Sequence, residues 1–126
     1  NLLREFGRKI GRSFQIQDDV LEIFSDSKTM GKSLKSDLLL GKKTFLMVKA
    51  ENYNPGFIQE SKDKISDNYD LGITHIREIL IKSHIYEEAL AMINTNLDDA
   101  NRILNDLNYD SKYLEYFCQL IGNRKF

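Results

Sequence analysis

The feature that most constrains the fold is a helical spacing of apolar residues that continues through about residue 25. At about 100° per residue, six apolar residues share one stripe and three cover the adjoining side. The first group is Leu3, Phe6, Ile10, Phe14, Leu21 and Phe24, and the second is Ile16, Val20 and Ile23. The chain has 126 residues, a single proline, and seven glycines that fall mostly between helical patterns. Because alternation of β-branched residues is also scarce, the sequence predicts an all-α fold.

Composition limits the classes of protein to consider. A chain of 126 residues is one domain or part of one. Hydrophobic residues make up 41% and charged residues 29%, as is usual for soluble globular proteins. A net charge of −1 gives no reason to expect nucleic acid or an anionic membrane as a partner. No apolar run approaches the ~20 residues that span a bilayer. Cys118 has no second cysteine to pair with, which favours a reducing, cytoplasmic compartment.

The pattern predicts six helices. We expect them at about residues 2–25, 43–53, 54–66, 70–83, 85–107 and 111–121, with a polar loop over residues 25–33. Asn54 and Pro55 are expected as the N-cap and first residue of the third helix. The chain opens at Asn1 without a capping sequence before it and without a signal-peptide pattern. We therefore expect it to begin inside a helix, as part of a longer chain would.

Carboxylates gather on one side of the first helix. We call this side the acidic strip, and it consists of Gly11, Gln15, Asp18, Asp19 and Glu22. Asp18 and Glu22 are a like-charge pair one turn apart, which costs a few tenths of a kcal/mol even in water. Burial without a partner would cost much more. A bound Mg²⁺ would resolve the conflict, because this ion binds through one or two carboxylates together with substrate phosphates. The alternative is a solvated acidic edge beside a loop.

Two glycines, Gly7 and Gly11, lie one turn apart on the acidic side of the same helix. Each weakens the helix by roughly 1 kcal/mol relative to alanine. They make room either for a ligand or for a closely packed helix, and the sequence leaves both alternatives open.

Lysines next to glycines follow the acidic helix. Lys32 comes after Gly31, and Lys42, Lys43 and Thr44 follow Gly41. If the chain folds back here, these cations face the acidic strip. Lysines, a metal ion and the N–H groups of a helix start together suit a diphosphate. The spacing is not that of a P-loop.

Residues 6–24 resemble the second aspartate-rich region of the polyprenyl synthetase family, whose pattern is FQxxDDxxD and which here reads FQIQDDVLE over residues 14–22. The lysines just described and Asp37 match the family in order and near spacing. The resemblance implies that residues 1–126 are the C-terminal portion of the isoprenoid synthase helical bundle. It also implies a Mg²⁺-dependent prenyltransferase that joins an allylic diphosphate to isopentenyl diphosphate, and a homodimer.

The resemblance also implies roles for single residues. Asp18 would be the Mg²⁺ ligand, with Asp19 and Glu22 supporting it. Phe14 and Gln15 would contact the substrate. The residues implied to bind diphosphate oxygens are Lys32, Lys42 and Lys43, and Thr44 would order the helix start beside them. Asp18, Lys32 and Lys42 are thus the expected catalytic residues.

The chain departs from the family pattern in two ways. Glu22 stands where aspartate is usual, and the first DDxxD motif is absent. We therefore expect the chain to be inactive without the segment that carries that motif. Two alternatives remain: a non-catalytic partner subunit of a prenyl synthase, and a terpene cyclase of the same fold. Elsewhere, Asp98 and Asp99 are expected to form a solvated helix face, and His75 and His84 lie too far apart in sequence for a helical metal pair.

Overall fold

The computed structural model describes residues 1–26, 28–41, 44–106 and 112–123, and within these ranges it is built from helices with no strand. The helices are α1 (Leu2–Phe24), α2 (Lys28–Leu39), α3 (Phe45–Tyr53), α4 (Phe57–Asp67), α5 (Tyr69–Lys82), α6 (Ile85–Asp106) and α7 (Lys112–Gly122). The predicted all-α fold is confirmed. No described helix combines the length and the apolar character that crossing a bilayer requires.

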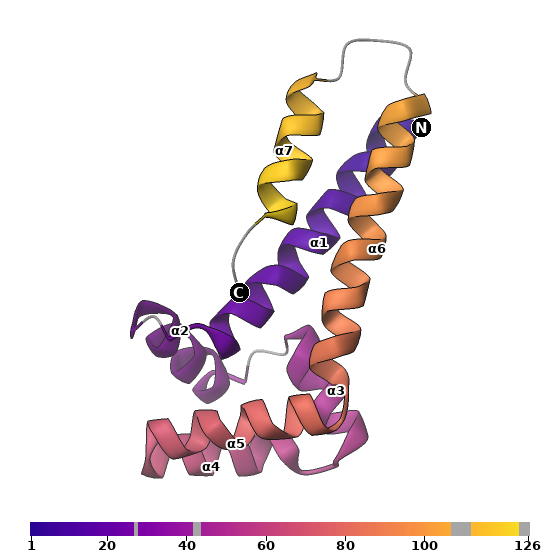
Figure 1. Cartoon of the computed structure of the whole chain (residues 1–126). Coiled ribbons are helices and arrows are strands. Elements are labelled where there is room, and N and C mark those ends of the chain that lie inside the picture. Colours follow the sequence, from indigo (N-terminus) through magenta and orange to yellow (C-terminus); the bar gives the residue numbers. More distant parts are fainter. Residues whose placement is uncertain (27, 42–43, 107–111, 124–126) are drawn as a thin grey trace.

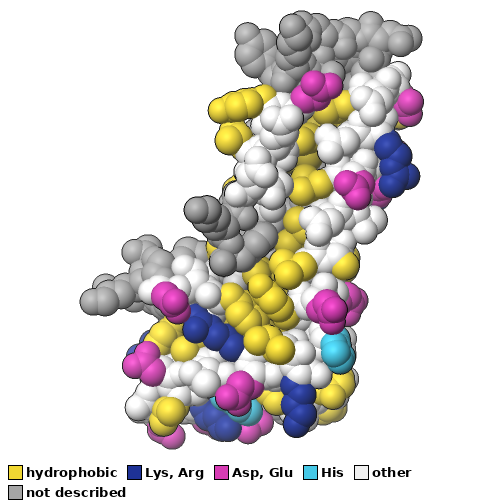
Figure 2. Space-filling model, in the orientation of Figure 1, with side chains coloured by type: hydrophobic (Ala, Val, Ile, Leu, Met, Phe, Trp, Pro, Cys, Tyr) yellow, Lys and Arg dark blue, Asp and Glu magenta, His cyan; other side chains and the backbone are white. Residues whose placement is uncertain are grey.

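The two longest helices, α1 and α6, run antiparallel along each other and form the spine of the molecule (Figure 1). The shorter helices α3, α4 and α5 lie at the end of the spine where α1 finishes and α6 begins. There α2 flanks the end of α1, whereas α7 lies beside the first part of α1. In the space-filling view, hydrophobic side chains gather between α7 and α6 and above α5, and charged side chains lie mainly toward the outer edges (Figure 2).

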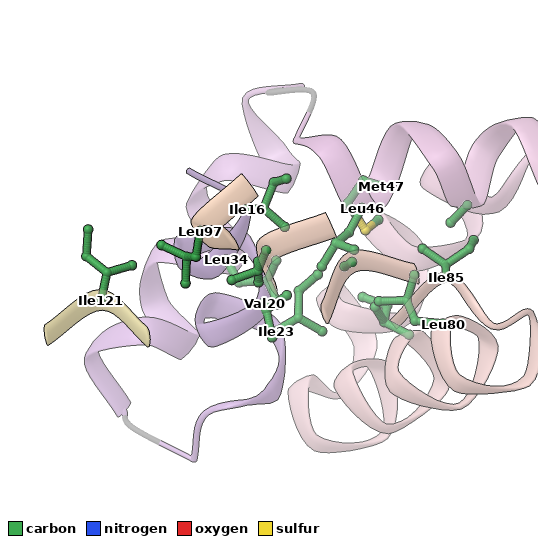
Figure 3. Packing of buried hydrophobic residues seen from close by; sticks show 14 of the residues in the cluster. Ile16, Val20, Ile23, Leu34, Leu46, Met47, Leu80, Ile85, Leu97 and Ile121 are labelled. Carbon is green, nitrogen blue, oxygen red and sulfur yellow. The ribbon is translucent and has the colours of Figure 1, made fainter. Parts of the chain in front are cut away.

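The core draws on every helix of this arrangement. Figure 3 shows labelled side chains from α1, α2, α3, α5, α6 and α7 packed toward a shared interior. They are Ile16, Val20, Ile23, Leu34, Leu46, Met47, Leu80, Ile85, Leu97 and Ile121. Phe57 of α4 is the largest fully buried side chain among the described residues. Burial of such side chains removes apolar surface from water, the main driving force for a helical bundle.

Two polar side chains lie within the buried face of α1. Ser13 Oγ donates to the carbonyl oxygen of Ile93 in α6 at 3.2 Å. Gln17 Nε2 donates to the carbonyl oxygen of Ile121 in α7 at 2.8 Å. Both side chains are almost completely buried, so their hydrogen bonds offset the cost of removing them from water. These bonds also fix where α6 and α7 stand along α1.

Part of the predicted apolar stripe of α1 faces solvent. Phe14 is 44% exposed and Leu3 is 50% exposed, although both belong to that stripe. α1 is turned about its own axis so that part of the stripe points away from the core, because α6 packs against the side that carries Ser13 and Val20. Apolar content alone did not specify this rotation, since apolar residues occupy most sides of α1.

Both ends of α1 are capped. Asn1 Oδ1 accepts from the backbone N–H of Leu3 at 2.9 Å and from that of Arg4 at 3.3 Å, so the expectation of an uncapped start was wrong. At the other end, Arg77 of α5 donates from Nε to the carbonyl oxygen of Ile23 at 2.7 Å and from Nη2 to that of Ser25 at 3.0 Å. A cation at a helix C-terminus also complements the helix dipole.

The prediction of a polar loop over residues 25–33 is mostly wrong, because α2 begins at Lys28. The helix is polar in its first half, and it is held by Leu34 and Leu38, which lie one turn apart and are both buried. Tertiary packing of these two leucines overrides the loop-like local sequence. The third predicted helix also begins later than expected, at Phe57 with Gly56 as its N-cap, and not at Pro55.

The start of α4 is capped from a distance. Gly56 has φ +94° and no side chain that can accept a hydrogen bond. Instead the Glu51 carboxylate at the end of α3 accepts from the backbone N–H groups of Ile58 and Gly56, each at 3.1 Å. These hydrogen bonds lower the pKa of Glu51, because they stabilise the charged form.

We predict that Gly72→Ala destabilises the chain. A Cβ atom at Gly72 would lie 2.6 Å from Ile65 Cγ1 and 2.7 Å from the Ile65 backbone nitrogen, so α4 and α5 would have to separate. The expected loss is about 1–3 kcal/mol of unfolding free energy, measured by urea unfolding. Gly7→Ala is the matched control, because a Cβ atom there meets nothing within 4 Å, and it should stabilise α1 by about 1 kcal/mol. Equal effects of the two substitutions would contradict the close contact of α4 with α5.

We predict that Glu51 contributes stability that acid removes. Its pKa is lower in the folded state than in the unfolded state. The contribution is therefore fully present above the unfolded value of about 4.3 and is lost as the pH falls through the folded value. Unfolding free energy measured between about pH 3 and pH 6 should fall less steeply toward acid in Glu51→Gln than in the parent chain. Asp98→Asn, a change to an exposed carboxylate of α6, is the control and should leave the slope unchanged.

Candidate functional site

The acidic strip lies along the second half of α1 and becomes progressively buried toward the helix end. Gln15 is exposed, Asp18 and Asp19 are half-buried, and Glu22 is only 9% exposed. Burial increases in this direction because α2, α3 and α5 all contact α1. A solvated acidic edge therefore does not describe the whole strip, since Glu22 lies among packed helices.

Asp19 joins the acidic strip to the start of α3. Its Oδ2 accepts a hydrogen bond from the backbone N–H of Phe45 at 2.9 Å. Thr44 is the N-cap of α3, and its Oγ1 accepts from the N–H of Met47 at 3.4 Å. Thr44 therefore lies at a helix start, where the expected role would place it. Carboxylates at helix N-termini are favourable both as hydrogen-bond acceptors and as charges facing the helix dipole.

This contact brings the start of α3 to the acidic strip. Thr44 directly follows the Lys42-Lys43 pair in the chain. Lys42 and Lys43 themselves lie outside the described residues. Lys32 belongs to α2, which packs on α1, but its side chain is also outside the described part. The structure therefore brings the helix start that follows the lysine pair to the acidic strip.

Two cations flank Phe45, and sequence reasoning missed both. Arg12 Cζ of α1 lies 5.2 Å from the centroid of the Phe45 ring, and Lys49 Nζ of α3 lies 5.3 Å from it. Lys49 also forms an ion pair with Glu88 of α6. The signal available in the sequence was spacing: Arg12 stands seven residues before Asp19, which puts both on one side of a helix.

The carboxylates fit an open magnesium site better than a closed one. Among the residues that the structure describes, no three His, Cys, Asp or Glu side chains converge to hold a metal ion. Mg²⁺ does not require such a cage, because it keeps several waters and takes one or two carboxylates plus substrate phosphates. Asp18 and Asp19 supply hard oxygen donors in half-buried positions on one helix. The metal roles of Asp18, Asp19 and Glu22 stay predictions.

The glycines of α1 face open space. A Cβ atom added at Gly7 or Gly11 would meet no atom within 4 Å. In the described part of the chain, these glycines therefore do not make room for a closely packed helix, which was one of the two alternatives. Phe14, also exposed, follows Gly11 by three residues along α1.

Other candidates are accounted for by packing or pairing. Asp98 is exposed as expected, but Asp99 is not simply solvated, because its Oδ2 lies 3.1 Å from Lys9 Nζ of α1. His75 packs against Phe57 with ring centroids 6.0 Å apart. Cys118 is buried, and burial raises the pKa of its thiol, which disfavours the reactive thiolate.

A surface hollow of about 450 Å³ lies between α6 and α7. It is lined by Asn94, Leu97, Asp98, Asn101, Cys118, Gln119, Gly122 and Asn123. None of these residues belongs to the acidic strip or to the start of α3. The hollow is therefore separate from the candidate site.

Comparison with known proteins places the site within a matched region. The family model described as polyprenyl synthetase matches residues 1–80, which include the acidic strip and the start of α3. A geranylgeranyl diphosphate synthase of Sulfolobus acidocaldarius is 46% identical over 135 aligned positions, covering 98% of this chain and 39% of that protein. No solved structure matches the chain.

Two further relatives bear names of the same kind. A short chain isoprenyl diphosphate synthase of Methanocaldococcus jannaschii is 48% identical over 48 residues, or 38% of this chain and 15% of that protein. Heptaprenyl diphosphate synthase component 2 of Bacillus subtilis is 31% identical over 123 residues, or 96% of this chain and 35% of that protein. The chain thus spans well under half the length of these relatives. Because the family model matches residues 1–80, which carry the acidic strip, the chain belongs to the polyprenyl synthetase family.

Proposed function

We propose that this chain supplies the second aspartate-rich motif and the diphosphate-binding lysines of a prenyltransferase that condenses an allylic diphosphate with isopentenyl diphosphate. The observation that carries the proposal is the hydrogen bond from Phe45 N–H to Asp19 Oδ2. It joins the acidic strip to the helix start that follows the lysine pair in the chain, which supports a single site for a metal and an anion. Family membership and the names of the relatives support the same reaction class.

In this reaction the C–O bond of the allylic diphosphate breaks and its electron pair leaves with the diphosphate. The double bond of isopentenyl diphosphate then attacks the allyl cation, a C–C bond forms, and a proton is lost. The main requirement is electrostatic stabilisation of the departing diphosphate. Bound Mg²⁺ would supply Lewis-acid neutralisation of charge on the diphosphate oxygens.

The residues of this chain would divide that work. Asp18 holds the metal ion, with Asp19 and Glu22 supporting it directly or through water. The cationic groups Lys32, Lys42 and Lys43 would bind diphosphate oxygens. Phe14 and Gln15 are exposed on the same helix and contact the substrate, while the Thr44 cap keeps the start of α3 in register with the strip.

The remainder of the proposal concerns the whole protein. The family's first DDxxD motif is not present in these residues, so we propose that the chain needs a segment carrying that motif for turnover. We further propose a cytoplasmic homodimer. A second candidate is a partner subunit without turnover of its own. One relative is named as component 2 of its synthase, which supports an assembly of more than one component. Such a subunit would bind Mg²⁺ and diphosphate but would not support catalysis when joined to a first DDxxD motif.

We predict that Asp18→Ala lowers kcat by about two orders of magnitude in the complete synthase that contains this sequence. Loss of one electrostatic stabiliser of the transition state costs about 3 kcal/mol, which corresponds to that factor. Steady-state kinetics with an allylic diphosphate and isopentenyl diphosphate measure it. Asp98→Ala, which changes an exposed carboxylate of α6 outside the site, is the control and should have nearly no effect. If both variants behave alike, the role assigned to Asp18 is wrong.

Lys32→Ala provides a contrast within the same experiment. A lysine that contacts the diphosphate does so in the ground state and more strongly in the transition state, where charge builds up on the diphosphate, so its loss should raise KM as well as lower kcat. A change confined to kcat would show that Lys32 contacts the diphosphate only in the transition state.

We predict that Mg²⁺ and inorganic diphosphate stabilise the protein cooperatively. A ligand that binds the native state raises the melting temperature, and two ligands that share a site raise it by more than the sum of their separate effects. Thermal unfolding with Mg²⁺, with diphosphate and with both tests this in the complete synthase. An additive response would argue against a shared site, and Asp18→Ala should abolish the cooperative part.

A further inference from the structure

Phe45 connects α3 to α1 beside the acidic strip, and it is linked to α6 through Lys49. It is the first residue of α3, and its backbone N–H donates to Asp19 Oδ2 of α1 at 2.9 Å. Its ring has Arg12 Cζ of α1 at 5.2 Å and Lys49 Nζ of α3 at 5.3 Å. Lys49 is in turn paired with Glu88 of α6. Contacts from α1 and α3 thus converge on this residue, and Lys49 links it to α6.

The backbone bond constrains the orientation of the Asp19 carboxylate. The first N–H groups of a helix lack partners within the helix, so the direction of the Phe45 N–H is fixed by α3 itself. A carboxylate has two oxygens and about four lone-pair directions, so accepting this bond restricts its rotation without exhausting its capacity. Groups that orient a metal-supporting carboxylate influence metal affinity even though they do not touch the metal.

The ring contacts constrain where that N–H stands. A cation within about 6 Å of an aromatic centroid is attracted to the face of the ring. Arg12 belongs to the same helix as Asp19, so its contact with Phe45 ties the start of α3 to α1 at a second point. Lys49 and Glu88 add a tie to α6. Two attachments to α1, one through the backbone and one through the ring, hold the start of α3 in a fixed position relative to Asp19.

We propose that Phe45 is a positioning residue: its backbone N–H orients the Asp19 carboxylate for metal support, and its ring, flanked by Arg12 and Lys49, holds that N–H in place. This inference rests on the proposed function, because it assumes that the acidic strip binds Mg²⁺ with diphosphate. It assigns a role to Phe45, Arg12 and Lys49, which neither the motif nor the lysine pair includes.

Substitutions at residue 45 separate the backbone bond from the ring. Phe45→Tyr keeps both, Phe45→Leu keeps the N–H and loses the ring, and Phe45→Pro loses both. Proline is well tolerated at the first position of a helix. Thr44 precedes it with φ −85° and ψ 162°, an extended conformation that suits a residue before proline. The proline variant is therefore expected to fold and to lack the hydrogen bond.

The measurement is the Mg²⁺ concentration that gives half-maximal thermal stabilisation of the complete synthase in the presence of inorganic diphosphate. Phe45→Pro should raise it by about 10- to 100-fold, the usual effect of losing a group that orients a metal ligand. Phe45→Leu should raise it by about two- to fivefold, the scale of a lost cation–π contact, and Phe45→Tyr should restore the parent value. Equal values for the proline and leucine variants would overturn the role of the N–H.

A double-mutant cycle keeps the inference testable if the proline variant does not fold. Arg12→Met should raise the same Mg²⁺ concentration by no more than Phe45→Leu does, because the leucine variant also loses the contact of Lys49 with the ring. Adding Arg12→Met to Phe45→Leu should raise it no further, because the ring that Arg12 contacts is already absent. Additive effects would show that Arg12 does not act through the ring. In steady-state kinetics, saturating Mg²⁺ should restore the activity that these variants lose at low Mg²⁺. A general loss of structure would leave the activity low at every Mg²⁺ concentration.

Asp18→Ala distinguishes this inference from the proposed function. If Asp18→Ala leaves the Mg²⁺- and diphosphate-dependent stabilisation intact, the proposed function fails and the inference fails with it. If Asp18→Ala abolishes that stabilisation while Phe45→Pro, Phe45→Leu and the parent protein require the same Mg²⁺ concentration, the metal site stands and the positioning role of Phe45 alone is wrong.

Discussion

The packing of α1 against α6 is the contact on which the rest of the structure depends. It buries one side of α1, and the hydrogen bond from Ser13 Oγ to the Ile93 carbonyl oxygen fixes the register of the two helices. Gln17 does the same for α7 through the carbonyl oxygen of Ile121. Buried polar groups that must be satisfied permit few alternative alignments. The remaining sides of α1 are thereby set at a defined rotation, and the acidic strip is one of them.

The acidic strip becomes a site through helices distant in sequence. Arg77 of α5 caps the end of α1 through the carbonyl oxygens of Ile23 and Ser25, just before α2 begins. Phe45 brings the start of α3 to Asp19. Each of these bonds uses a backbone group at a helix end, where polar groups lack partners within the helix. The end of α1 and the start of α3 thus both lie near the carboxylates, and their backbone groups, which need capping, hold the neighbouring helices in place.

Sequence reasoning succeeded where the signal was local. It predicted the all-α fold and the extent of α1, because apolar spacing acts over a few residues. It failed for α2, whose first half is polar and whose helix is held by Leu34 and Leu38 against other helices. It also missed the cap of α4, because Glu51 acts from the end of the preceding helix and not from the N-cap position.

The sequence by itself determined the chemistry available: carboxylates on one side of a long helix, lysines beside glycines after it, and membership of a family whose pattern these residues follow. Tertiary structure decided which of these groups meet. The rotation of α1, which leaves Phe14 exposed and Glu22 buried, depends on the side that α6 covers. The contact of Arg12 with Phe45 joins residues from two helices. Such choices depend on the sum of many contacts between distant segments, which no local pattern of residues encodes.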